Sequence, residues 1–105
     1  MKLEVDQAVY ASLATLVAHL GRQRPRAPLA LRRLFAQSLD SIERFPRLHS
    51  LVEDEYPGVE VREYFIKRFC FRVLYFIDGQ RLVVFDIVHS DRRPGAWHRR
   101  LDTFH

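Results

Sequence analysis

A run of histidine, arginine and tryptophan side chains follows an apolar segment near the end of the chain. Residues 89–100 read HSDRRPGAWHRR and come directly after LVVFDIV, which has the composition of a buried strand. An imidazole can act as a general base or acid near neutral pH, and a guanidinium can stabilise charge that develops on a phosphate. The run could therefore take part in phosphate chemistry or bind an anionic macromolecule.

Cleavage of RNA through the ribose 2′-hydroxyl requires a base, an acid and fixed cations. His89, Arg62 and Arg93 are the candidate catalytic residues for this reaction, provided that the fold brings them to one edge of a sheet. Two of them have structural alternatives, because His89 could cap its strand and Arg62 could pair with Glu60 or Glu63. The histidines lack the spacing and the companions of zinc ligands, so we expect neither a metal nor a cofactor.

The same run has a second interpretation as a binding surface, because a rigid sheet can aim flexible side chains that stand just beyond a strand end. Five side chains are candidates for contact with the target: Arg92, Arg93, Trp97, His98 and Arg100. Trp97 could instead pin the polar tail to the sheet. Arg92 and Arg93 could equally lie in a solvated loop held by Asp91 and Asp102.

Arginine dominates the positive charge of this 105-residue chain. Of its 17 basic residues only Lys2 and Lys67 are lysine, and the formal net charge is +4 with an isoelectric point near 9.7. Because a guanidinium grips phosphate or carboxylate with two hydrogen bonds, this composition favours an anionic partner, either nucleic acid or an acidic protein segment. A genome rich in G and C would produce the same bias without any function.

Length and hydrophobic content indicate one domain spanning residues 1–105. Hydrophobic residues make up 48% and charged residues 29% of the chain, which is enough apolar material for an ordinary two-layer core. The single Cys70 excludes an internal disulfide and a cysteine-based zinc site. The N-terminus lacks the apolar stretch of a signal peptide, and no window reaches the ~20 apolar residues of a membrane span. We therefore expect a cytoplasmic protein without a membrane partner.

Two amphipathic helices are predicted in the first half of the chain. Residues 2–5 alternate polar and apolar as in a short strand, and Asp6 is placed to cap the helix that follows. Apolar residues then recur every three or four positions up to Gly21, a residue typical of helix C-termini. After the linker RQRPRAP, a second apolar stripe runs from about Pro28 to Phe45. Such a helical hairpin cannot bury its stripe alone and needs a sheet to cover.

Three segments rich in β-branched and aromatic residues are predicted to be β-strands: residues 59–66, 70–77 and 81–88. The dipeptide Asp78-Gly79 between the last two is a hairpin signal, so the strands should form an antiparallel meander. The middle strand is apolar on both faces apart from Arg72, and it should be central. The predicted fold class is α+β, with a short N-terminal strand and a helical hairpin packed as one layer on a twisted antiparallel sheet.

Four segments together carry a family resemblance: RLFAQSLDSIERFP, GVEVREYFI, RFCFRVLYFIDG and IVHSDRRPGAWHRR. They cover much of the chain and resemble the RelE/ParE superfamily of small bacterial toxins from type II toxin–antitoxin systems, also described as plasmid stabilisation proteins. The last segment is the most specific, since ParE-like members carry a strand ending in His, two basic residues, Pro-Gly, an aromatic residue and a final Arg. The resemblance therefore implies the ParE-like subgroup and its fold.

This resemblance implies a growth-inhibiting toxin that a cognate antitoxin, encoded by an adjacent gene, holds inactive. ParE-type relatives poison DNA gyrase, whereas RelE-type relatives cleave messenger RNA on the ribosome. The chain has no tyrosine after Tyr75, where RNA-cleaving relatives often have one, and this favours the gyrase type. Two other departures are Cys70, where relatives often have Pro, and Asp86 within the last strand, for which Arg72 is a candidate partner.

The antitoxin is expected to donate a segment that folds on binding, either as a helix beside the hairpin or as a strand at the sheet edge. Four hairpin arginines are candidates for contact with it: Arg22, Arg26, Arg32 and Arg33. Their charge predicts that the segment is acidic. The alternative from another class of function is a non-catalytic nucleic-acid-binding or adaptor domain that reuses the same fold.

Overall fold

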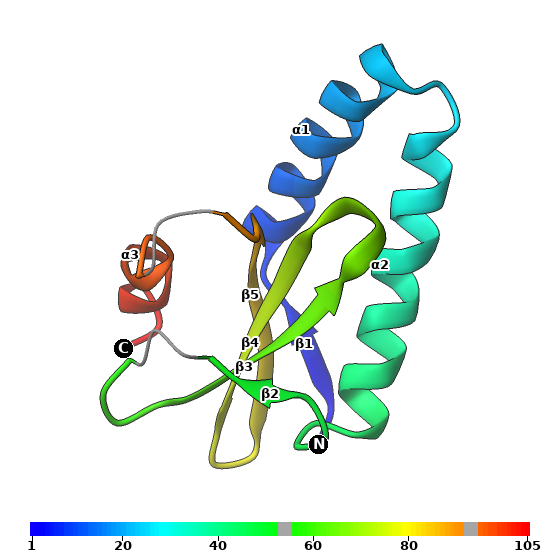
Figure 1. The fold of residues 1–105 in the computed structure, drawn as a ribbon. Helices are drawn as coiled ribbons and strands as arrows, with labels where there is room; N and C mark the ends of the chain where they lie inside the picture. The colour runs from blue at the N-terminus through cyan, green and yellow to red at the C-terminus, as the bar shows by residue number, and fades with distance from the viewer. Residues whose placement is uncertain (53–55, 92–94) are drawn as a thin grey trace.

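The computed structural model describes residues 1–52, 56–91 and 95–105, and it has the predicted α+β architecture (Figure 1). The strands are β1 (Leu3–Val5), β2 (Ser50–Leu51), β3 (Glu60–Ile66), β4 (Phe71–Asp78) and β5 (Arg81–His89). The helices are α1 (Gln7–Gln23), α2 (Ala27–Arg44) and α3 (His98–Asp102), and a 3-10 turn, Lys67–Phe69, joins β3 to β4. Within the described part of the chain, no helix combines the length and the apolar character needed to cross a membrane.

The five strands form one sheet in the order β1-β5-β4-β3-β2. β3, β4 and β5 are the antiparallel meander predicted from the sequence, with β4 in the centre. The N-terminal strand pairs in parallel with β5, so the sheet is mixed rather than purely antiparallel. β2 was not predicted, because two residues are too few to show a periodic pattern, and it pairs with β3 at the opposite edge.

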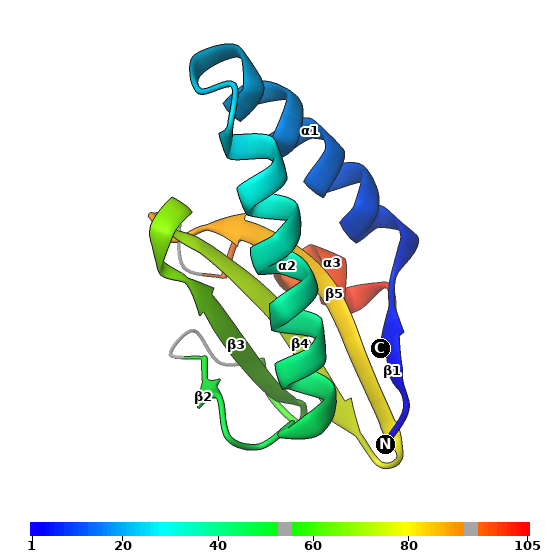
Figure 2. The same ribbon diagram turned by 90° about the vertical axis from the view of Figure 1, so that its right-hand side faces the viewer.

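α1 and α2 form the predicted hairpin and cover one face of the sheet (Figure 2). Asp6 caps α1 as predicted, and its Oδ2 accepts the Ala8 N–H at 3.2 Å. α1 continues two residues beyond Gly21. A Cβ atom at Gly21 would lie 3.2 Å from the ring of Pro28. This close approach packs the two helices together near their loop. The core between hairpin and sheet includes Val9, Leu13, Leu31, Phe35, Ile42, Val73, Tyr75 and Val84.

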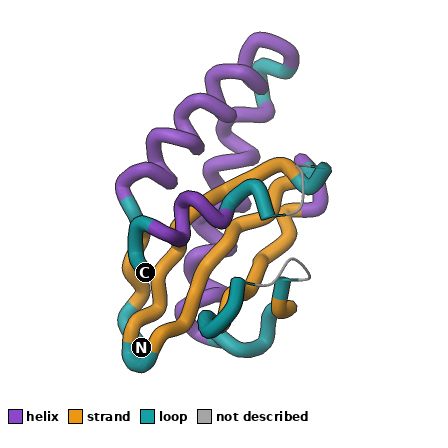
Figure 3. Tube along the Cα trace, turned by 90° about the vertical axis from the view of Figure 1, so that its left-hand side faces the viewer, coloured by secondary structure: helices purple, strands orange, loops and turns teal. Residues whose placement is uncertain are grey.

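A second apolar layer covers the other face of the sheet, where the sequence pattern predicted no helix. α3 lies over this face (Figure 3). Five buried side chains form the contact between α3 and the sheet: Leu74, Phe76, Phe85, Trp97 and Leu101. α3 has only five residues, too few to reveal a helical period in the sequence. Helices therefore lie on both faces, and the expected single layer is corrected.

β4 is buried on both faces, as its apolar pattern predicted, with five consecutive buried residues from Val73 to Ile77. Its polar exception, Arg72, has the partner that the sequence required, since it forms an ion pair with Glu63 of β3. The turn into β5 is the predicted hairpin, and Gly79 takes a φ of +59° there. Glycine adopts this left-handed conformation without the steric cost that other residues bear.

Candidate functional site

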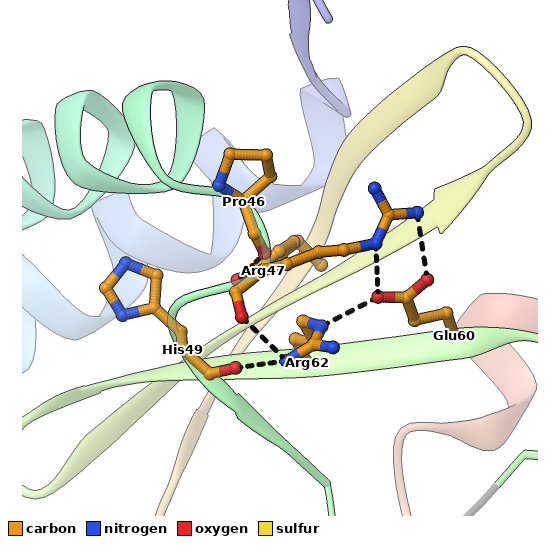
Figure 4. A network of polar contacts seen from close by, with 6 residues as sticks. Pro46, Arg47, His49, Glu60 and Arg62 are labelled. Carbon is orange, nitrogen blue, oxygen red and sulfur yellow. Dashed lines mark hydrogen bonds and ion pairs between the residues drawn. The ribbon is translucent and has the colours of Figure 1, made fainter.

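Arg62 lies at the centre of a polar network beside the connector between α2 and β2 (Figure 4). Its guanidinium donates to the backbone carbonyl of His49 at 2.6 Å and to that of Arg47 at 3.2 Å, and its Nε donates to Glu60 at 2.8 Å. The Arg47 side chain adds two hydrogen bonds to Glu60, both at 3.2 Å. Three acceptors therefore hold Arg62, and only 16% of its side chain is exposed.

The residues around this network fix the connector against the sheet. Tyr75, directly opposite the central arginine in the strand register, donates its hydroxyl proton to the Pro46 carbonyl at 2.7 Å. His49 Nε2 lies 2.9 Å from the Ser41 hydroxyl, and its ring packs edge-on against Tyr64 with centroids 5.0 Å apart. None of these roles was predicted, because no local pattern signals a bond between residues so far apart in the sequence.

Glu60 and Tyr75 each keep a single protonation state near neutral pH. Burial alone would raise the pKa of Glu60, but the hydrogen bonds from Arg62 and Arg47 outweigh that effect, and the pKa lies below its usual value. Burial raises the pKa of Tyr75 to about 12, although the nearby Arg62 charge opposes the shift. The carboxylate stays charged and the phenol stays neutral, so neither group is suited to proton transfer near pH 7.

His89 lies at the end of β5, as predicted from the sequence. Its Nδ1 contacts the Asp91 carboxylate, and its ring packs edge-on against Phe71 with centroids 5.5 Å apart. About half of the side chain, 49%, is exposed. The carboxylate orients the imidazole, an arrangement that occurs in catalytic and in purely structural histidines alike.

The structure does not bring His89 and Arg62 together. Arg62 pairs with Tyr75 and His89 pairs with Phe71, so four residues of β4 separate them, which is about 13 Å along the strand. The two residues also belong to strands on opposite sides of β4. The third candidate catalytic residue, Arg93, lies outside the described residues. Within the ranges that are described, no group of three or more His, Cys, Asp and Glu side chains is placed to hold a metal.

Trp97 anchors the C-terminal tail to the sheet. It is 2% exposed and packs against Phe85, with ring centroids 5.7 Å apart. His98, another candidate for target contact, lies against the rings of Trp97 and Tyr56. Tyr56 donates a hydrogen bond to Asp102, and this bond raises the pKa of Tyr56. The segment from Trp97 to Asp102 is thus held by aromatic packing and by a polar contact.

Arg100 also has structural partners. It donates to Asp6 Oδ2 at 3.2 Å and to a backbone carbonyl of β5 at 3.0 Å. Because Asp6 caps α1, Arg100 ties α3 to the start of the hairpin. Trp97 and Arg100 therefore support the fold, while Arg92 and Arg93, the adjacent candidates for target contact, lie outside the described residues.

The four candidates for antitoxin contact lie towards the tip of the helical hairpin. Arg22 lies in the last turn of α1, Arg26 directly precedes α2, and Arg32 and Arg33 lie in its second turn. All four are exposed, and so is Arg24 in the loop between the helices. That loop lies beyond the end of the sheet (Figure 1).

A helical hairpin packed on a five-stranded mixed sheet is an α+β fold that a solved structure shares. The chain matches one chain from the chromosomal ParDE TA (toxin–antitoxin) system from P. aeruginosa, with a TM-score of 0.72 and 17% sequence identity. The match covers 87% of this chain and 97% of that chain, and it confirms the ParE-like fold that the sequence resemblance implied. No protein-family model matches the sequence, and no curated protein matches it.

Proposed function

We propose that the chain is the toxin of a type II toxin–antitoxin system, held inactive by a cognate antitoxin encoded beside it. The observation that carries this proposal is the fold, which is shared over 87% of this chain with a chain from a ParDE system. Because one fold can host several functions, the fold needs support from the residues. The segment HSDRRPGAWHRR, in the order typical of ParE-like toxins, provides that support.

We infer that inhibition of DNA gyrase is a better candidate mechanism than cleavage of messenger RNA. RNA cleavage needs a cation and a base that reach the same phosphate. Arg62 is engaged by three acceptors, and about 13 Å of β4 separates it from His89. This separation argues against the pair acting together on one phosphate, and the missing C-terminal tyrosine argues in the same direction.

The antitoxin segment is proposed to be acidic and to contact Arg22, Arg26, Arg32 and Arg33. These side chains are exposed, and a segment with aspartate and glutamate would supply the carboxylates that they lack. Exposed ion pairs are screened by salt, so the complex should weaken as ionic strength rises. A complex that is insensitive to salt, or an antitoxin segment without acidic residues, would contradict this assignment.

Induced expression of the chain, alone and together with the neighbouring reading frame, tests the proposed function. Expression alone should stop growth, and co-expression should restore it. Arrested cells should accumulate gyrase-linked DNA breaks while their messenger RNA on ribosomes stays intact. Cleaved messenger RNA without DNA breaks would instead assign the chain to the RelE type. Unaffected growth without the neighbour, at an expression level confirmed by immunoblot, would contradict a toxin and favour the non-catalytic binding domain.

A further inference from the structure

The positive charge of the chain is concentrated in the helical hairpin. From Gln7 to Leu39 the sequence holds five arginines and no aspartate or glutamate, a formal charge of +5. The rest of the chain holds the other 12 of 17 basic residues and all 13 acidic ones, a formal charge of −1, so the hairpin accounts for the whole positive excess. We call these five residues the tip arginines: Arg22, Arg24, Arg26, Arg32 and Arg33.

Most of the other arginines that the structure describes are paired with carboxylates, with Arg68 and Arg99 as the exceptions. Six of them form ion pairs: Arg44, Arg47, Arg62, Arg72, Arg81 and Arg100. Within residues 1–52, 56–91 and 95–105, no tip arginine forms such a pair, and all five are exposed. Arg22 contacts His19 Nδ1 at 3.4 Å, which neutralises no charge. The tip is therefore a surface of unneutralised guanidinium groups, whose field attracts anions.

The tip arginines lie on a projecting part of the molecule. Both views place the loop between α1 and α2 beyond the end of the sheet (Figures 1 and 2). Arg26 and Arg33 are seven residues apart, which puts them on one side of α2, and the rise between them is about 10 Å. Leu31 and Phe35 mark the buried side of the same helix. A rigid partner can thus approach the exposed side without meeting the sheet.

The tip has few of the features that anchor another protein. Protein interfaces are organised around clusters of aromatic and apolar side chains. In the segment from His19 to Arg33, the one large exposed apolar side chain is Leu29, which is 59% exposed. There is also no Phe, Tyr or Trp between Ala11 and Leu34 on which the bases of a single strand could stack. Charge without such anchors fits the backbone of a duplex, which presents one negative charge per ~1.7 Å of its axis.

We propose that the tip arginines bind the phosphate backbone of double-stranded DNA without sequence preference. Arginine suits this contact because its fork matches two phosphate oxygens and loses its hydration more easily than an ammonium does. The inference goes beyond the proposed function, since the chain would bind DNA whether or not it is a toxin. One consequence does rest on the proposed function: an acidic antitoxin segment on the same arginines would compete with the duplex.

Fluorescence anisotropy with the purified full chain and a labelled duplex of about 20 base pairs tests the proposal, with salt varied from about 50 to 200 mM. If all five arginines neutralise phosphates, the plot of log K against log[salt] should have a slope of about −4.5. The double variant R32Q/R33Q should make the slope about 2 units shallower and weaken binding at the lowest salt by more than about tenfold. R44Q is the matched control, because Arg44 lies in the same helix, is also exposed and pairs with Asp40. It should leave both the affinity and the slope unchanged.

The variant R24Q/R26Q changes two arginines in the loop and provides a second test that does not alter the helix interior. Circular dichroism checks that each variant is folded. Absence of duplex binding by the folded chain, or an equal loss in R44Q, would overturn the proposal. Tighter binding of the single strand than of the duplex would also overturn it. Tighter binding of poly-glutamate than of the duplex would overturn it as well, and would leave the tip to the acidic antitoxin segment alone. Growth arrest and rescue by the neighbouring gene are measured separately, so failure of DNA binding and failure of the toxin assignment are distinguishable.

Discussion

Arg62 and Tyr75 lie directly opposite each other in strands β3 and β4, and both donate hydrogen bonds to backbone carbonyls of the connector between α2 and β2. Arg62 reaches the carbonyls of Arg47 and His49, and Tyr75 reaches that of Pro46. One cross-strand pair thus holds three residues of the connector near the sheet. The strand arginine that suggested phosphate contact in the sequence therefore has a structural role that stability measurements can quantify.

Replacing Arg62 with Met should lower the free energy of unfolding by about 2 kcal/mol, because it removes a charged donor from Glu60 and from two carbonyls. The variant Arg62→Lys should recover only part of the loss, since an ammonium group cannot reproduce the planar arrangement of donors in a guanidinium. R81M is the control, because Arg81 and Glu4 are both half-exposed and exposed ion pairs contribute little to stability. Equal losses in the free energy of unfolding for R62M and R81M, measured by urea unfolding, would contradict the structural role of Arg62.

The stability contributed by Tyr75 should depend on pH in the alkaline range. Its pKa is about 12 in the folded protein, above the ordinary value of 10.0, so its contribution is complete below pH 10 and is lost as the pH rises towards 12. Tyr75→Phe removes both the hydrogen bond to Pro46 and the titration. The free energy of unfolding of the wild type should exceed that of Y75F by about 1 kcal/mol at pH 8. This difference should shrink between about pH 10 and 12. A difference that stays constant with pH would show that this hydroxyl does not titrate as proposed.

Trp97 should contribute more to stability than any other residue of the tail. Trp97→Ala removes a buried side chain from the layer beneath α3 and should cost about 3–5 kcal/mol, whereas Trp97→Phe should cost less. Arg99→Ala changes an exposed neighbour and should stay within about 0.5 kcal/mol of wild type. Urea unfolding followed by circular dichroism measures all three. If W97A lowers the free energy of unfolding no more than R99A does, the tail is not anchored through the Trp97 ring.

Cys70 should not tolerate replacement by proline. Its φ is +57°, whereas proline requires about −65°, and its N–H donates to the Lys67 carbonyl at 3.2 Å. Cys70→Pro should therefore destabilise the chain by about 2 kcal/mol or more. Cys70→Gly accommodates the positive φ and serves as the control, with a small effect expected. Thermal unfolding distinguishes the two, and a C70P variant as stable as C70G would contradict this backbone conformation.

Much of the architecture could be predicted because it depends on short-range patterns. The apolar repeats of three and four residues predicted α1 and α2, and the runs on either side of Asp78-Gly79 predicted β4 and β5. The apolar composition of both faces predicted that β4 is central. α3 and β2 were missed, because five residues and two residues are too short to display a period.

The partners of polar groups could be predicted less well than the elements. The sequence left Arg62 with two possible partners, Glu60 and Glu63, and in the fold it pairs with Glu60, which is two residues away on the same face of β3. Glu63 lies on the other face and pairs with Arg72 of the neighbouring strand. Which carboxylate each arginine reaches therefore depends on the face of the sheet and on the register of the neighbouring strand.

Amino-acid order was sufficient for the two long helices, the strands β1, β3, β4 and β5, the hairpin turn and the charge of the helical hairpin, because each depends on neighbours along the chain. The pairing of β1 with β5, the connector bound by Arg62 and Tyr75, and the contact of Arg100 with Asp6 across 94 positions required the folded chain. Such contacts form only when distant segments pack, and their energies depend on distances that no local pattern contains.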